Sequence, residues 1–150
     1  MNDRPKELLR ENLDDLFRAK KHLDYSYGQI ISYDAAFGQY NEEQLETVEA
    51  FTSRFARCAD LLVNKVLRSL DRYELKSGGT LLDVIIRAEK RGIIPNVDEL
   101  REMKDIRNII AHDYAGIQME QVFEYCKHKK PHFDDLCLNL KNYVDQLLKS

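Results

Sequence analysis

The sequence predicts an all-α protein, an antiparallel up-and-down bundle of four to five main helices plus a short helix. Three observations predict this fold class. Glycine (6) and proline (3) are scarce, apolar residues recur at spacings of three and four, and no stretch alternates with period two. With 150 residues, 43% of them hydrophobic and 33% charged, the chain suits a single domain over residues 1–150.

The first helix is expected from about Pro5 to Ser32, because proline fits the first turn of a helix. The connector from Tyr33 to Tyr40 has no clear period. Its aromatic residues and Tyr25 lie outside the clearest apolar stripes and are candidates for contact area between two copies. The stripe of the first helix consists of Leu9, Leu13, Leu16, Leu23, Tyr27 and Ile30.

The second helix begins after Asn41, which with Gln44 forms a predicted capping box. From Leu45 to Tyr73, apolar residues recur at every third or fourth position over about 30 residues. A stripe of that length needs long neighbouring helices to cover it, so it favours a bundle.

The third helix is predicted to begin after Thr80, with Asp83 completing a capping box, and to end at Gly92. The preceding Ser77-Gly78-Gly79 lacks the GxxxxGK[ST] pattern of a phosphate loop. The fourth helix is predicted to begin after Asn96, with Glu99 as the reciprocal capping residue.

A short helix around Met119 to Phe123 is expected next, followed by a last helix that begins at Pro131. Proline costs about 3 kcal/mol inside a helix, which is why a helix start is expected there.

The chemistry of the sequence is concentrated in RNIIAHDY, where Arg107, His112 and Tyr114 lie within eight residues at the end of the fourth helix. Arg107 and His112 are five residues apart, about 140° around a regular helix, so they do not touch directly. They can border one groove from its two sides, most easily if a second copy packs across it. A histidine can accept the proton of a ribose 2′-OH, and an arginine can stabilise the charge that builds on the phosphate. The two residue types therefore suit RNA cleavage without a metal.

The pattern Arg107-x4-His112-x-Tyr114 resembles the signature of HEPN-domain proteins, in the subgroup of HepT-like toxins. The helical order is also similar, over roughly Glu43 to Leu148. The resemblance implies a HEPN-like bundle that forms a homodimer and cleaves RNA without metal or cofactor. In that family the toxin is paired with a minimal nucleotidyltransferase (MNT) antitoxin.

Carried onto this chain, the resemblance implies catalytic roles for Arg107 and His112, with Asn108 and Asp113 in support. It also implies that the antitoxin silences the toxin by adding AMP to Tyr114. The alternative is a noncatalytic partner subunit of the nucleotidyltransferase, in which the same residues bind nucleotide or substrate. A scaffold with a coincidental motif is a third reading, with Arg107 in a surface salt bridge and His112 favoured by the helix dipole.

Two other clusters of polar residues have the composition of a binding site. Lys127, Lys129 and Lys130 form a short basic run, either a solvated turn or a contact to RNA phosphates. A zinc site is not expected, because Pro131 is predicted to break the helix that carries His128 and His132.

Composition limits location and partners. The N-terminal MNDRPKELLREN lacks the apolar segment of a secretory signal, and no apolar run approaches the roughly 18 residues of a membrane span. Cys58, Cys126 and Cys137 are odd in number and sit at core-like positions, which fits buried thiols in the cytoplasm. The net charge of −3 means that any RNA must be held by a local basic patch.

Overall fold

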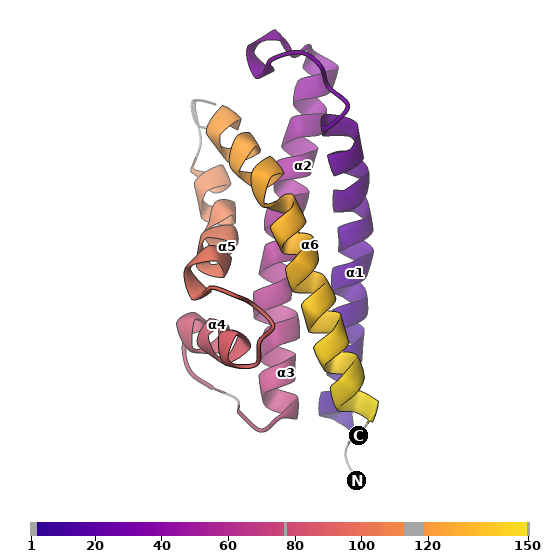
Figure 1. The fold of residues 1–150 in the computed structure, drawn as a ribbon, viewed down its shortest axis with the longest axis vertical. Helices are drawn as coiled ribbons and strands as arrows, with labels where there is room; N and C mark the ends of the chain where they lie inside the picture. Colours follow the sequence, from indigo (N-terminus) through magenta and orange to yellow (C-terminus); the bar gives the residue numbers. More distant parts are fainter. Residues whose placement is uncertain (1–2, 77, 113–118, 150) are drawn as a thin grey trace.

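The computed structural model describes residues 3–76, 78–112 and 119–149, in which all the regular secondary structure is helical. Helix α1 (Arg4–Ile30) runs up the bundle, and α2 (Glu42–Asp60) returns antiparallel beside it (Figure 1). A π-helical stretch, η2 (Leu61–Leu67), and then α3 (Arg68–Tyr73) continue the line of α2. The predicted second helix of about 30 residues is therefore one continuous rod, with a π-helical segment that the apolar spacing did not reveal.

The second half of the chain completes the bundle. Helix α4 (Leu81–Lys90) lies across one end, α5 (Val97–Ala111) runs up beside α2, and α6 (Met119–Lys149) descends across the front in the view of Figure 1. The connector between α1 and α2 contains one 3₁₀ turn, η1 (Phe37–Gln39). The predicted all-α bundle is confirmed. None of the described helices is both long and apolar enough to cross a membrane.

The helix ends follow the predicted capping chemistry, with one exception. The Asn41–Gln44 and Thr80–Asp83 capping boxes both form. Gly92 has a φ of 78°, and α4 ends there with the N–H of Ile93 donating to the carbonyl of Ala88 at 3.0 Å.

The exception is the start of α5. Asn96 caps it by accepting from the N–H of Glu99 at 3.2 Å, as predicted. The Glu99 carboxylate, however, is turned toward Lys129 and His132 on α6, each 3.0 Å away. These two side-chain partners outweigh a single backbone N–H at the exposed cap, so the reciprocal half of the box was predicted wrongly.

The division of the C-terminal region at Pro131 was also wrong, because α6 passes through this proline without a break. The expected short helix is the first part of α6. Side chains on both sides of Pro131 belong to the same core, including Phe123 and Cys126 before it and Phe133 and Cys137 after it. Burial of these side chains stabilises the continuous helix by more than the roughly 3 kcal/mol that an internal proline costs.

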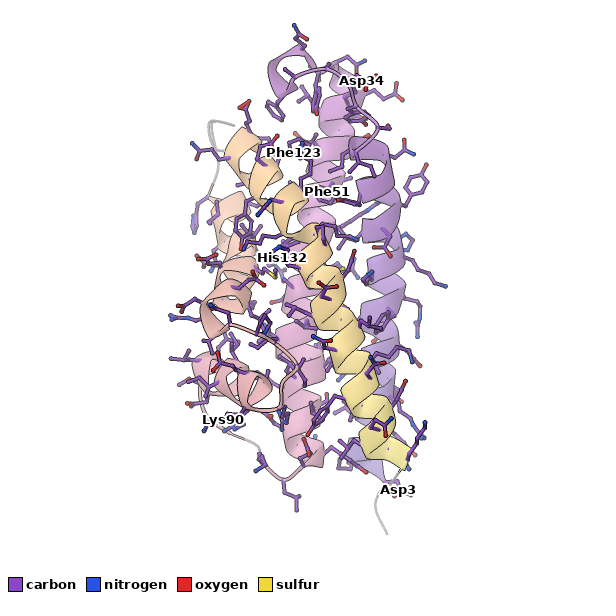
Figure 2. The ribbon with its side chains drawn as sticks, in the orientation of Figure 1. Asp3, Asp34, Phe51, Lys90, Phe123 and His132 are labelled. Carbon is purple, nitrogen blue, oxygen red and sulfur yellow. The ribbon has the colours of Figure 1, made fainter. Side chains whose placement is uncertain are left out.

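The core is aromatic where α2 and α6 cross. Phe51 and Phe123 meet edge to face with ring centroids 6.2 Å apart (Figure 2). The connector covers this crossing, since Phe37 and Tyr40 pack on Phe123 with centroids 5.8 and 6.1 Å away. These connector rings therefore close the core of their own chain, whereas Tyr25 on α1 is 68% exposed.

Candidate active site

Arg107 lies on the last turns of α5, where the helix runs beside α2. Its side chain is 65% exposed, and its Nη1 donates to Oδ2 of Asp60 at 3.2 Å. Ile106, the preceding residue, is buried and fixes which face of α5 meets the core. The helix therefore presents the guanidinium at the surface, with one edge held against α2.

Asp60 organises this part of the surface. It is the last residue of α2 before the π-helical stretch, and its carboxylate is 24% exposed. Besides Arg107, it accepts from Nδ2 of Asn64 at 2.8 Å and pairs with Nζ of Lys104 at 3.3 Å. No motif in the sequence marks Asp60. The available signal was an aspartate inside an otherwise apolar helical stretch, because such a residue needs cationic partners from another helix.

A shallow groove of about 600 Å³ opens beside this ion pair. Asp60 and Arg107 line it together with Leu61, Ile110 and Ala111, and its far side reaches Arg57 on α2. The groove thus combines a cation that can bind phosphate with small and apolar side chains that a second surface can cover.

His112 follows α5 directly as its C-cap residue and is exposed. Its backbone N–H donates to the carbonyls of Asn108 at 3.1 Å and Ile109 at 3.2 Å. His112 is therefore fixed at the same end of the same helix as Arg107, where the helix dipole favours a positive charge. Asp113 and Tyr114, the predicted supporting and modified residues, lie outside the described part of the chain.

Asn108 is exposed beside the arginine and donates to the carboxylate of Asp105 at 3.0 Å, one turn earlier. It lines a second groove, of about 520 Å³, that runs along α5 toward α4. Three carboxylates, of Asp98, Glu102 and Asp105, line this acidic groove beside two cations, Arg101 and Lys104, so its lining has a small excess of negative charge.

The basic run of α6 is occupied by ion pairs. Lys130 is 2% exposed and lies 2.7 Å from both Asp24 of α1 and Asp134 of its own helix. Lys129 pairs with Glu99 at 3.0 Å, and Lys127 with Glu124 at 3.5 Å. An RNA contact by these lysines, as predicted from the sequence, would have to compete with these ion pairs.

The three cysteines and the two histidines of α6 form no metal site among the described residues. Cys58, Cys126 and Cys137 are all fully buried, as predicted, and burial raises the pKa of the Cys58 and Cys126 thiols to about 12. His128 and His132 are exposed, with ring centroids 5.7 Å apart. In the ranges that the structure covers, no three His, Cys, Asp or Glu side chains are grouped to hold a metal.

The bundle, with an arginine on the last turns of α5 and a histidine directly after it, defines a HEPN-like helical domain. The profile of the HepT-like family, described as "Ribonuclease HepT-like", matches residues 36–140. Because this match spans well over half of the chain, the protein belongs to the HepT-like ribonuclease family. No curated protein and no solved structure was found to match the sequence.

Proposed function

We propose that this chain is a metal-independent endoribonuclease toxin that acts in the cytoplasm and cleaves RNA in a cleft shared by two copies. The observation that carries the proposal is the exposed Arg107 at the rim of a groove, with His112 at the end of the same helix. Membership of a ribonuclease family supports RNA as the substrate.

The proposed chemistry needs only this chain's residues and the RNA itself. His112 accepts the proton of a ribose 2′-OH, and the freed 2′-oxygen attacks the adjacent phosphorus. Arg107 stabilises the negative charge on the phosphate oxygens as the bond to the 5′-oxygen breaks. The 5′-oxygen leaves and takes a proton from solvent water, the other fragment ends in a 2′,3′-cyclic phosphate, and His112 returns its proton to solvent. Asn108 and Asp113 support this site in the proposal.

Sharing of the cleft is supported by the surface around Arg107. Leu61, Ile110 and Ala111 give the groove an apolar side, which a symmetric contact between two copies would cover. Such a contact brings the ends of two α5 helices together. An arginine of one copy and a histidine of the other can then act on one phosphodiester.

The proposed function includes regulation by modification of Tyr114. A nucleotidyltransferase antitoxin would add AMP to Tyr114, two residues beyond His112, and so block the cleft. Intact-mass measurement after co-expression with the nucleotidyltransferase tests this, because each AMP adds a fixed mass that a Tyr114→Phe variant would lack.

A second candidate function is a noncatalytic subunit that binds nucleotide or substrate beside a nucleotidyltransferase. The ion pair between Arg107 and Asp60 favours it, because a guanidinium that already has a carboxylate partner is partly neutralised. Tight nucleotide binding without RNA turnover would select this function over the first.

The deciding experiment is cleavage of labelled RNA in EDTA by the wild type and by His112→Ala and Arg107→Ala. We expect each variant to lose about 10²-fold or more in rate, as for removal of a general base or of a transition-state cation. Arg101→Ala is a matched control, because Arg101 is an exposed arginine of α5 that lines the acidic groove. Equal cleavage by wild type and His112→Ala would remove the histidine from the mechanism.

A further inference from the structure

A third groove, of about 640 Å³, lies between α1 and α2. Arg18 and His22 of α1 line it from one side, and Arg54 and Arg57 of α2 from the other. A single carboxylate, that of Asp15, faces these three arginines. In a chain whose net charge is −3, this is a local reversal of sign, as binding of a polyanion requires.

This basic groove adjoins the groove beside Arg107. Both are lined by Arg57 and Leu61, so the two grooves meet at these two side chains on the rod formed by α2 and η2. A strand whose scissile phosphate sits at Arg107 therefore reaches Arg57 next and the other arginines beyond it. The acidic groove on the other side of α5 has a small excess of negative charge and is the less favourable route for RNA.

The arginines are placed to meet phosphates. Nη1 of Arg54 donates to the carbonyl of His22 at 3.1 Å and also to the hydroxyl of Ser26, which fixes its guanidinium against α1. Arg57, one turn further along α2, is exposed. Arg18 is 72% exposed and makes only a loose pair with Asp15 at 3.4 Å. Exchange of that weak surface pair for a phosphate costs little.

We propose that this α1–α2 groove, through Arg18, Arg54 and Arg57, holds the backbone phosphates of single-stranded RNA on one side of the cleavage site. The proposal rests on the proposed ribonuclease function and adds a substrate-positioning surface to it. Among the described residues that line the groove none is Phe, Tyr or Trp, so these residues offer the bases no aromatic platform to stack on. Binding here is therefore independent of sequence and depends strongly on salt.

The test uses Arg18→Gln with Arg57→Gln, since both side chains are exposed and Arg54 is needed to join α1 to α2. Arg72→Gln with Lys90→Gln is the matched control, because it removes two exposed cations near α4. Each pair is made in a His112→Ala background, which keeps the RNA intact. Fluorescence anisotropy then measures binding of a labelled oligouridine of about 12 nucleotides, between about 50 and 200 mM KCl.

We expect the groove pair to weaken binding about tenfold at the lowest salt and the control pair to leave it nearly unchanged. The slope of log affinity against log salt should fall by about 1.4, which is about 0.7 for each lost phosphate contact. Equal effects of the two pairs on RNA binding would overturn the proposal. It would also be overturned if the groove pair kept its affinity for RNA and instead lost binding to an acidic protein.

The same pairs with His112 intact separate this proposal from the ribonuclease function. If the wild type cleaves RNA in EDTA, the groove pair should raise KM about tenfold and leave kcat within about twofold. If the enzyme cleaves RNA and the groove pair has the same KM as the control pair, the groove proposal would fail and the ribonuclease function would stand. If the wild type never cleaves RNA but the groove pair still weakens RNA binding, the groove proposal would stand and the ribonuclease function would fail.

Discussion

Two carboxylates on the same helical rod are paired with arginines from later helices, and the two sites differ in burial. Asp71, on α3, is 2% exposed and accepts from Arg87 at 2.8 Å and Arg91 at 2.7 Å. The side chain of Asp60 is 24% exposed, and that of Arg107, whose Nη1 lies 3.2 Å from the Asp60 carboxylate, is 65% exposed.

The same chemical pair therefore has two uses. At Asp71 the arginines are shielded by the bundle, and Arg91 also binds Glu74 at 2.9 Å, so the cluster ties α3 to α4. At Asp60 most of the guanidinium faces a groove and can bind another anion. Exposure, more than the presence of an ion pair, distinguishes an arginine available to a substrate from one that holds the fold.

The largest expected effect is on the stability of the buried cluster. Asp71→Asn should reduce the free energy of unfolding by about 3–5 kcal/mol, because it removes the buried carboxylate that pairs with Arg87 and one of the two carboxylates that pair with Arg91. Chemical denaturation monitored by circular dichroism measures this. Arg72→Gln, an exposed neighbour on α3, should change stability by less than about 0.5 kcal/mol. A loss at Asp71 no greater than at Arg72 would erase the contrast between the two sites.

The next effect concerns the geometry of the exposed arginine. Arg107→Lys keeps the charge and loses the planar fork that can bind two phosphate oxygens. We expect kcat for RNA cleavage to fall about 10- to 100-fold, with the unfolding midpoint nearly unchanged. Full activity in the lysine variant would show that charge alone suffices and that the fork is not used.

A smaller effect is expected for Asp60→Asn. The amide still holds Arg107 by a hydrogen bond but removes a negative charge from the groove, so RNA should bind more tightly while the arginine is less well oriented. KM and kcat should both fall, each by about tenfold or less, which corresponds to about 1.4 kcal/mol. Steady-state kinetics beside Asp105→Asn, which changes a carboxylate of the acidic groove, tests this split. A change in stability of several kcal/mol would instead place Asp60 with Asp71 as a structural residue.

The smallest expected effect is on the pH dependence of stability at Glu99. Its side chain is 16% exposed, between Asp71 and Asp60, and it binds Lys129 and His132. Burial pushes its pKa up, but the hydrogen bonds from His132 and Lys129 outweigh burial and hold the pKa below the usual 4.5. A carboxyl with a lowered pKa stabilises the fold above pH 4.5, and this contribution is lost as the pH falls through the folded-state pKa.

Glu99→Gln should therefore lose less stability than the wild type on acidification from pH 5 to pH 3. Thermal melts across this range measure the difference. Parallel curves for the two proteins would show that the pair between α5 and α6 contributes no pH dependence.

Much of the fold was predictable because it depends on local rules. The spacing of Leu45 to Tyr73 and the caps at Asn41 and Thr80 are properties of neighbouring residues, and the structure confirms them. The continuation of α6 through Pro131 was not predictable in this way, because it depends on side chains from other helices that bury Phe123 and Phe133 together.

The residues of the candidate site also differ in whether local sequence or tertiary packing brings them together. Arg107 and His112 could be proposed as site residues from the sequence because they share one helix end and a recognisable spacing. Asp60 and the arginines of α1 and α2 are 40 or more residues away in sequence, and only packing brings them together. The basic run of α6 was the opposite case, because Lys130 is charged in the sequence yet buried between two carboxylates in the fold.

The burial of all three cysteines has a practical consequence for work on assembly. With their pKa values raised by burial, these thiols should resist alkylating reagents at neutral pH while the protein is folded. A cysteine introduced in place of Ser53, an exposed residue at the edge of the Arg107 groove, would then be the one site that takes a spin label. The separation between two such labels would report directly how closely two copies approach through this face in solution.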